Sequence, residues 1–459
     1  MNKKNIASKI AFLMLLCVLI ALPQDNFYAN DLKASKTSVN KSIEAVGQYI
    51  NWDGVSNVSQ FLDKNNELCF AYDNGKYVSV IKTKNGKQLS GILKLKKKAP
   101  LYGAITCDPE GNYYIVTGRE NSGTNTNKKT VFITRYDESG KETGSVGDNG
   151  NSSGLFYTKL PFYGGNCDIA VNGDYVAVNY ARLMYSDHQS NSLILINKQT
   201  MEKFRVWKYY NSHSFAQRVI PFQNRFLLAS EGDCYSRAFS VALTEAPTDD
   251  TYQFIHQDYD IFHFWVKKGT LDNWDMGTLN DNFAHMGGVA QLNNQQAALV
   301  ATSAKSLNKK AAKENEQLFI QIFDPTKDLD GENGLTYITS GVRSGLSGEN
   351  GTTKVEDFGV KWLTNYSKSY TIENPQVVST DNGKYVILFE RYKNYNFQGV
   401  FSVIVDSNGK VVQKVTKISK TAYLNPCRIP VYSNGCVSWV GNKYGSSKNS
   451  IYIYRYAVK

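Results

Sequence analysis

Short apolar runs alternate with polar turns along almost the whole chain. The runs are rich in Val, Ile, Tyr and Phe and are bounded by clusters of Gly, Asn and Asp, which is typical of β-strands joined by tight turns. Beyond the N-terminus, no convincing stretch shows the periodicity of an amphipathic helix. The pattern therefore predicts an all-β protein.

One hexapeptide, DNGKYV, occurs twice, at residues 73–78 and 381–386. An Asn-Gly pair accepts the positive φ angles of a tight hairpin turn, and the following Tyr-Val begins an apolar strand. We interpret the two copies as equivalent positions of an internal repeat.

The strands group into units of four, each with turns rich in Asn, Asp and Gly. Seven units fit this frame: 58–98, 102–146, 166–209, 214–268, 285–342, 373–418 and a last one from residue 424 that has only three strands. Four-stranded sheets repeated around an axis bury both faces, but the first and last units must be joined. We expect residues 42–50 (SIEAVGQYI) to supply the missing strand.

On this strand-and-turn periodicity, the chain resembles the β-propeller superfamily over residues 42–459. The resemblance implies seven four-stranded blades closed by an N-terminal strand, with ligands usually bound at the mouth of the central channel. Six or eight blades are alternatives because the units differ in length. The WD dipeptides and kelch double glycines of particular propeller families do not recur at repeat intervals.

The N-terminus indicates export. Three lysines (Lys3, Lys4 and Lys9) precede an apolar run at 10–23 that is too short to cross a bilayer comfortably, as in a secretory signal peptide. We expect a signal peptide at 1–29, a polar lead at 30–41 and one propeller domain at 42–459, in a monomer that is secreted or associated with the cell surface. A retained anchor is the alternative.

The chain is basic, with a formal charge of +11. This charge favours an anionic partner such as a cell-envelope polymer, whereas no nucleic-acid-binding signature is present. Cys17 lies in the leader, and the other six of the seven cysteines suit either disulfides or buried thiols. No Cys/His spacing typical of a metal site occurs.

All five histidines lie between residues 188 and 285. His213 and His285 each precede the first strand of a unit, which places them near the channel mouth. Their polar neighbours are of the types that bind sugar hydroxyls or carboxylates. The candidate ligand-binding residues are His188, Gln189, His213, Gln217, Arg218, Asp233, Arg237 and His285. For each of them, a structural role in a turn or between blades is the alternative.

Two other motifs are weaker. Asp328, Asp330 and Glu332 alternate as calcium ligands do, but the glycine comes too early for an EF-hand loop, so a solvated turn is the alternative and no other cofactor is expected. Ser379–Gly383 resembles the Asp box of sialidase propellers, with Val386 in place of its Trp. The arginine triad and acid/base pair of sialidases have no recognisable counterpart. The aromatic stretch 251–274 suits either sugar stacking or an outer strand.

These observations predict a propeller that binds a glycan or cell-envelope polymer, without transforming it, at the channel mouth of blades three to five. A glycoside hydrolase or polysaccharide lyase using the same cleft is the alternative from another class, and a protein-interaction scaffold is the third. The sequence does not identify the ligand or decide whether the protein is catalytic.

Overall fold

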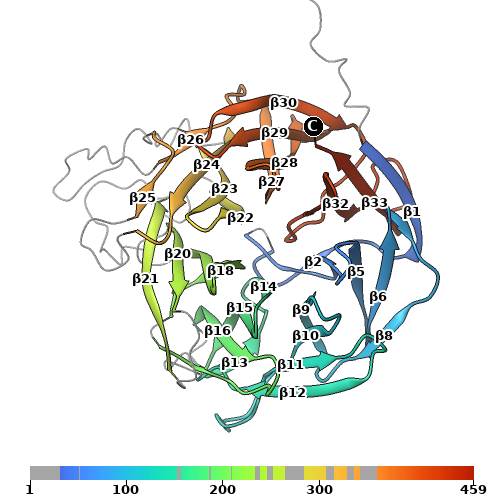
Figure 1. Cartoon of the computed structure of the whole chain (residues 1–459), viewed down its shortest axis with the longest axis vertical. Coiled ribbons are helices and arrows are strands. Elements are labelled where there is room, and N and C mark those ends of the chain that lie inside the picture. Colours follow the sequence, from blue (N-terminus) through green and yellow to red (C-terminus); the bar gives the residue numbers. More distant parts are fainter. Residues whose placement is uncertain are drawn as a thin grey trace, which may run out of the picture.

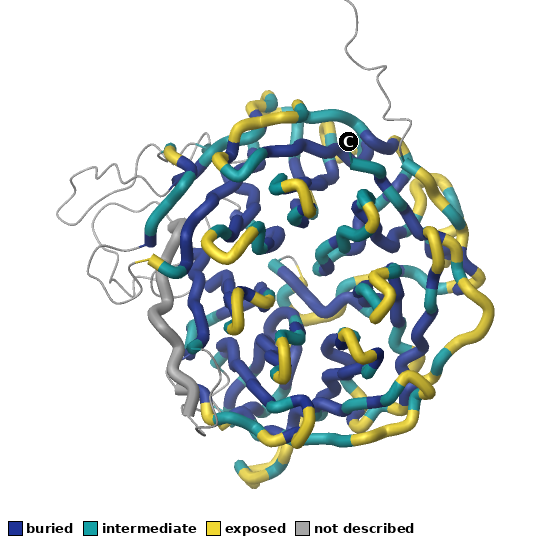
Figure 2. The backbone as a smooth tube through the Cα atoms, in the orientation of Figure 1, coloured by how far each residue is buried: buried dark blue, intermediate teal, exposed yellow. Residues whose placement is uncertain are grey.

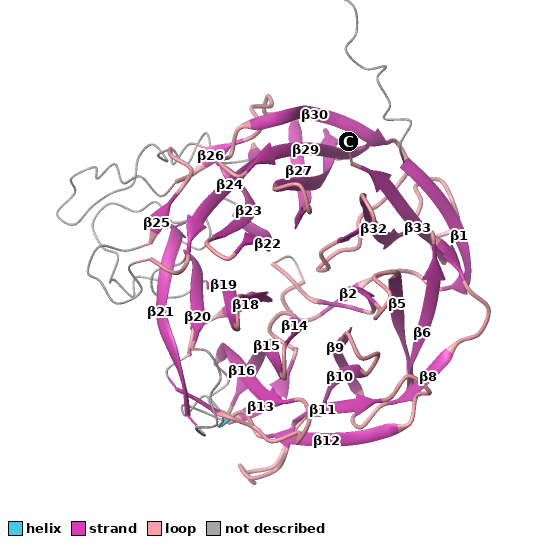
Figure 3. Cartoon of the chain, in the orientation of Figure 1, coloured by secondary structure: helices cyan, strands magenta, loops and turns pink. Residues whose placement is uncertain are grey.

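The computed structural model describes residues 32–50, 52–151, 157–185, 188–207, 209–232, 238–245, 252–263, 284–305, 315–327, 335–341 and 359–458. The described residues form strands β1 to β33 and no α-helix, so the ribbon in Figure 3 consists almost wholly of strands and connecting loops. Seven sheets stand around a central axis like the blades of a fan (Figure 1). The chain is a seven-bladed β-propeller, as the strand pattern predicts.

Each blade runs from an inner to an outer strand. Blade 1 comprises β4 (Val58–Leu62), β5 (Leu68–Asn74), β6 (Tyr77–Lys84), β7 (Lys87–Gln88) and β8 (Leu93–Lys96). Blade 2 comprises β9 (Leu101–Cys107), β10 (Tyr113–Gly118), β11 (Val131–Tyr136) and β12 (Glu142–Asp148). Blade 3 contains β13 (Thr158–Pro161), β14 (Cys167–Asn172), β15 (Tyr175–Met184) and β16 (Gln189–Asn197). Blade 4 contains β18 (Ser214–Phe222), β19 (Arg225–Gly232), β20 (Ala238–Thr244) and β21 (Tyr252–His263).

The other three blades follow the same order. Blade 5 comprises β22 (His285–Asn293), β23 (Gln296–Ala304), β24 (Glu316–Asp324) and two short outer pieces, β25 (Thr336–Tyr337) and β26 (Lys361–Trp362). Blade 6 comprises β27 (Tyr370–Ser379), β28 (Lys384–Lys393), β29 (Asn396–Asp406) and β30 (Val411–Ser419). Blade 7 comprises β31 (Val431–Ser433), β32 (Cys436–Gly441), β33 (Ser450–Ala457) and the N-terminal strand β1 (Leu32–Asn40).

The ring is closed by β1, which pairs antiparallel with β33 from Leu32 opposite Tyr456 to Asn40 opposite Ser450. An N-terminal closing strand was predicted, but its location was wrong. It lies within the segment expected to be a polar lead, and residues 42–50 follow it. The sequence LKASKTSVN has little apolar signal because this outer strand exposes much of its length, so backbone pairing rather than burial holds it.

Blade 3 departs most from the predicted frame. Its outer edge is formed by Lys203, which bridges Ile196 of β16, and by Phe204, whose N–H donates to the Leu195 carbonyl at 2.9 Å. The short strand β17 (Arg205–Trp207) then pairs in parallel with β21 of blade 4 instead of continuing along its own blade. This pairing adds a hydrogen-bonded link between neighbouring blades.

The core is divided among the spaces between sheets. Separate clusters of buried apolar residues lie between blades 3 and 4, 4 and 5, 5 and 6, 6 and 7, and 7 and 1, while another spans blades 1 to 3. Because a sheet between two neighbours has no solvent face, the middle strands are buried along most of their length, as the dark tube in Figure 2 shows. Exposed residues gather at turns and on the outer strands.

The repeated hexapeptide does not mark equivalent positions. Residues 73–78 connect the second and third strands of blade 1, whereas residues 381–386 connect the first and second strands of blade 6. The turns also differ, since Asn74 pairs directly with Tyr77 while the second loop runs from Ser379 to Tyr385. Their shared property is a glycine at positive φ, with Gly75 at 68° and Gly383 at 75°. A common turn chemistry, rather than the repeat itself, explains this identity.

Several sequence predictions fall outside the described residues: the signal peptide at 1–29, Asp233, Arg237, Cys234, and the calcium ligands Asp328, Asp330 and Glu332. The part of the chain that is described contains no helix both long and apolar enough to cross a membrane. Cys69, Cys107, Cys167, Cys427 and Cys436 are free thiols.

Candidate ligand cavity at the channel mouth

The segment between β1 and β4 fills part of the channel mouth; we call its described residues, 41–50 and 52–57, the plug. Its strands β2 (Ala45–Val46) and β3 (Val55–Ser56) form a small hairpin that reaches toward the axis (Figure 1). The backbone N–H of Gln48 donates to the Tyr163 carbonyl at 2.9 Å, and Ser56 Oγ donates to Asn425 Oδ1 at 2.8 Å. The plug is therefore fixed to blade 3 on one side and blade 7 on the other.

A buried ion pair holds the plug to blade 4. Arg218 Nη1 lies 3.0 Å from Asp53 Oδ2, and both side chains are almost wholly buried. Arg218 also donates to the Gly287 carbonyl of blade 5 at 3.0 Å. Burial alone would lower the pKa of Arg218, but Asp53 and Asp168 raise it above its ordinary value. Arg218 therefore stays charged, and the carboxylate of Asp53 in the plug balances its charge.

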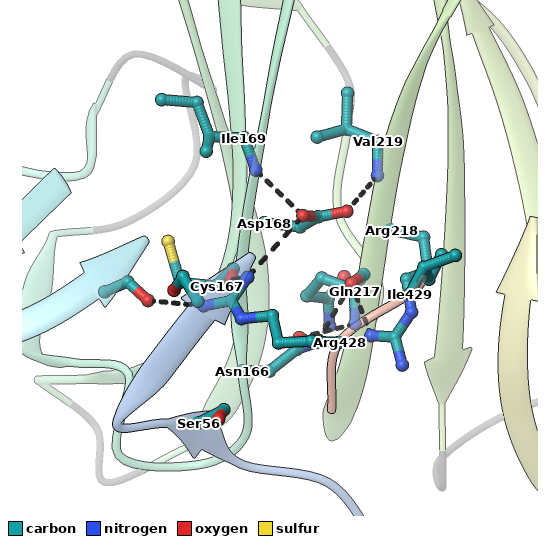
Figure 4. A network of polar contacts seen from close by, with 12 residues as sticks. Ser56, Asn166, Cys167, Asp168, Ile169, Gln217, Arg218, Val219, Arg428 and Ile429 are labelled. Carbon is teal, nitrogen blue, oxygen red and sulfur yellow. Dashed lines mark hydrogen bonds and ion pairs between the residues drawn. The ribbon is translucent and has the colours of Figure 1, made fainter. Parts of the chain in front are cut away.

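A second charged group crosses the channel (Figure 4). Arg428 donates to the carbonyls of Cys167 at 3.1 Å and Gly103 at 2.9 Å, and it lies 3.8 Å from Asp168 Oδ1. Asp168 accepts hydrogen bonds from the N–H groups of Ile169 and Val219, at 3.0 and 2.9 Å. Burial raises the pKa of Asp168, whereas the positive charges of Arg428 and Arg218 act to lower it.

These charged residues separate two cavities along the axis. Arg218, Cys427 and Arg428 line both of them. The cavity at the end away from the plug has a volume of about 460 Å³ and walls such as Phe61, Ile105 and Val219 from the inner strands. We call the cavity on the plug side the upper cavity.

Aromatic side chains attach the plug to blades 3 and 4. The rings of Tyr49 and Trp52 lie 5.2 and 4.9 Å from the ring of Phe215. Gln189 Nε2 donates to the Tyr49 hydroxyl at 2.9 Å. The predicted residue Gln189 thus contacts the protein's own N-terminal segment.

The upper cavity lies between the plug and the first strands of blades 5 to 7. Its volume is about 570 Å³. Its wall includes Trp52 from the plug and His285, Thr302, Glu316, Glu373 and Gln376 from blades 5 and 6. A volume of this size accommodates a small ligand or one sugar unit of a longer chain.

The carboxyl groups around the upper cavity have unusual acidities. Burial raises the pKa of Glu316 to about 8, and the nearby charge of Glu373 adds to the effect. Desolvation also raises the pKa of Glu373, although that side chain is exposed at the rim. Glu390 lies behind the wall, and burial raises its pKa to about 7. His285 belongs to the wall itself, and burial lowers its pKa. At neutral pH, Glu316 is therefore largely protonated and His285 is neutral.

Three buried polar atoms of residues that line this cavity have no hydrogen-bond partner among the described residues. They are Thr302 Oγ1, Gln376 Oε1 and Arg428 Nε. Gln376 uses its amide nitrogen to reach the Asn425 carbonyl at 2.7 Å, which leaves its oxygen unpaired. Buried polar atoms are normally paired, so each of these atoms needs a partner from water or from a ligand.

An aromatic patch lies at the same end of blades 6 and 7. In β27 and β28, Glu373 pairs with Glu390 and Tyr370 with Lys393, so the β28–β29 turn is at the cavity end. The patch comprises Tyr392, Phe397, Tyr423 and Tyr444. Phe397 is 4.3 Å from the Tyr423 ring and 5.5 Å from the Tyr444 ring, and Tyr444 is 54% exposed.

The structure gives partners to most of the predicted site residues. His188 Nε2 is 2.7 Å from Ser212 Oγ, and its ring lies 4.3 Å from that of His213. Gln217 Oε1 accepts a hydrogen bond from Ser230 Oγ at 2.9 Å. Its backbone N–H donates to Asn166 Oδ1, and its carbonyl accepts from Asn166 Nδ2. Arg218 and His285 line the upper cavity, whereas Asp233 and Arg237 lie outside the described residues. Ligand binding by this set stays a prediction.

Sequence reasoning missed Trp52, Glu316 and Glu373. Trp52 lies just beyond the segment that was assigned to the closing strand. Glu373 precedes an inner strand of a predicted unit, as His285 does, so the same positional rule would have found it. Nothing in the local sequence distinguishes Glu316, which belongs to β24.

No family model and no curated protein matches this sequence. Solved structures do align with it, including a Trypanosoma rangeli sialidase in complex with the inhibitor DANA, at 10% identity and a TM-score of 0.37 over 81% of this chain. The chain spans only 59% of that sialidase. YCF48 from Cyanidioschyzon merolae aligns at 8% identity and a TM-score of 0.45, over 93% of this chain and 98% of that protein. These values are too low to support an argument about function.

Proposed function

We propose that this protein is a binding propeller for a glycan, which it holds in the upper cavity and across the aromatic patch. The single observation behind this proposal is that a polar cavity and a partly exposed aromatic surface occupy the same end of blades 6 and 7. The proposed site is thus displaced from the predicted blades three to five toward blades five to seven.

A sugar chain matches both parts of this surface. Sugar hydroxyls are donors and acceptors, and the residues that line the cavity include both kinds of atom: Gln376 Oε1, Thr302 Oγ1 and Arg428 Nε have no partner among the described residues. The apolar face of a sugar ring packs on aromatic rings such as those of Phe397 and Tyr444. An anionic polymer is the ligand that the net charge favours, but the carboxyl group of Glu373 makes it a poorer match for this cavity.

A glycan array tests the proposal. We expect the mature protein to bind a defined subset of glycans, and Tyr444→Ala to weaken that binding about tenfold, equivalent to about 1.4 kcal/mol. Tyr432→Ala is the matched control because Tyr432 lines the other cavity, at the end away from the plug. An array without binding, or equal losses for the two variants, would contradict the proposed site.

A glycoside hydrolase is the second candidate, and one observation favours it. Glu316, with a pKa of about 8, is a neutral carboxyl at pH 7, which is the state that a general acid requires. Glu373 supplies a second carboxyl in the same cavity, and paired carboxyls perform most glycoside hydrolysis.

Product analysis separates the two candidates. An enzyme would generate new reducing ends from a bound polysaccharide, and Glu316→Gln would abolish them while binding persists. Glu202→Gln is the control, because Glu202 is exposed on a turn of blade 3 that does not line the cavity. Binding without any new ends would leave the binding module as the function.

A further inference from the structure

We infer that the upper cavity selects a glycan unit that carries a protonated amine, such as an amino sugar whose nitrogen is not acetylated. This inference rests on the proposed function and narrows it to one chemical class of ligand. It comes from the balance of charges and unpaired atoms in the cavity wall.

The arginines of the cavity are already neutralised. Arg218 is paired with Asp53 at 3.0 Å, and Arg428 lies 3.8 Å from Asp168 and donates to two carbonyls. His285 is neutral because burial lowers its pKa. The remaining ionisable groups of the wall are the Cys427 thiol, whose pKa is raised by burial, and the carboxyls of Glu44, Glu316 and Glu373. Every group left to carry a charge there is therefore acidic, although the chain as a whole carries +11.

A second observation is independent of those carboxyls. Gln376 is 3% exposed, its amide nitrogen is committed to Asn425, and its oxygen has no partner among the described residues. An amide oxygen is only an acceptor, so it requires a donor from the ligand or from water. Thr302, which is 1% exposed, adds an unpaired hydroxyl to the same wall.

An ammonium group suits this set because it donates three hydrogen bonds and accepts none. Its charge would also favour the ionised form of Glu316. Trp52 adds an aromatic ring to the wall, and cations are attracted to indole rings. The unpaired Nε of Arg428 is a donor and suits a ring hydroxyl of the same sugar.

Calorimetry with two matched oligosaccharides tests this inference. The probes are glucosamine oligomers with free amines and N-acetylglucosamine oligomers of the same length, titrated into the mature protein with EDTA present. We expect the aminated oligomers to bind at least tenfold more tightly. Non-specific attraction would give the opposite order, because the protein is basic.

Substitutions locate the effect. We expect Glu373→Gln to weaken binding of the aminated oligomer about tenfold, because the charge-assisted contact with the amine is lost. The affinity for the acetylated oligomer should stay unchanged. Glu202→Gln, on a turn away from the cavity, should change neither. Equal or tighter binding of the acetylated oligomers would overturn the amine inference while the proposed function stands. If the glycan array shows no binding at all, the proposed function fails with it.

Discussion

The polar side chains around the plug differ between its two sides. On the side of blades 3 and 4, Arg218 meets Asp53, and Gln189 meets Tyr49. On the side of blades 5 and 6, the side-chain oxygens of Thr302 and Gln376 have no partner in the described part of the chain, and the pKa of Glu316 is raised to about 8. Both sides belong to one channel mouth and lie around one short segment of chain.

This difference separates stability from binding. A paired, buried side contributes to the free energy of unfolding, and a ligand would have to displace the plug to reach it. On the other side, burial of polar groups without compensating hydrogen bonds lowers the stability of the folded state. We therefore expect substitutions near blades 3 and 4 to act on stability, and those near blades 5 to 7 to act on ligand binding.

The largest effect is expected from Arg218→Ala. The substitution leaves Asp53 buried without its partner, so the free energy of unfolding should fall by about 3–5 kcal/mol. Denaturant unfolding followed by tryptophan fluorescence measures this change.

A double variant, Arg218→Met with Asp53→Leu, is the control for that experiment. It removes both charges together, so most of the lost stability should return, since apolar pairs often replace buried ion pairs without loss. A loss below about 1 kcal/mol in Arg218→Ala, the range of exposed ion pairs, would contradict the stabilising role of the paired side.

The stability of the protein should depend on pH through the buried carboxyl groups of blades 5 and 6. Glu316, with a pKa of about 8, and Glu390, with a pKa of about 7, hold protons in the folded state that the unfolded chain releases near pH 4.5. The folded state thus binds more of these two protons between these values, so the stability that Glu316 and Glu390 contribute is greatest below about pH 4.5 and falls as pH rises through this window. Each such proton contributes at most about 1.4 kcal/mol per pH unit.

The substitution Glu316→Gln measures how much Glu316 contributes to the dependence of the free energy of unfolding on pH. Between about pH 5 and about pH 8, the variant should lose less stability than the wild type, because the amide does not titrate. Glu373, which faces Glu316, and Glu390 keep their own contributions. Glu202→Gln should retain the wild-type slope, and an unchanged slope in Glu316→Gln would show that Glu316 titrates normally in the folded protein.

Most of the fold follows from the sequence because each blade is built from local contacts. Turns rich in Asn and Gly between β-branched runs predicted the middle strands, including residues buried on both faces such as Val178 and Ile387. The closing strand was misplaced because its partner is β33, about 420 residues away, and a partly exposed edge strand needs no apolar pattern. The outer piece Lys361–Trp362 was not expected, because it also pairs across a long loop with β24.

The site was harder to predict because the fold assembles it from distant segments. His285 was identified by its position before an inner strand, and it does line the upper cavity. The role of Trp52 depends on the plug folding back into the channel, which no local pattern specifies. Gln217 was chosen for its polar side chain, but that side chain is bonded within blade 4, to Ser214 and Ser230.

The smallest expected effect compares Tyr49 of the plug with Tyr444 of the aromatic patch. Tyr49→Phe removes the hydroxyl that accepts from Gln189 Nε2, so the free energy of unfolding should fall by about 0.5–1.5 kcal/mol. The Tyr444 hydroxyl has no partner among the described residues, so Tyr444→Phe should change stability by less than about 0.5 kcal/mol. Thermal and denaturant unfolding of both variants measure the difference. Equal losses would mean that hydrogen bonding to the plug adds nothing to stability, and the distinction between a paired and an open side would then depend on the ion pair alone.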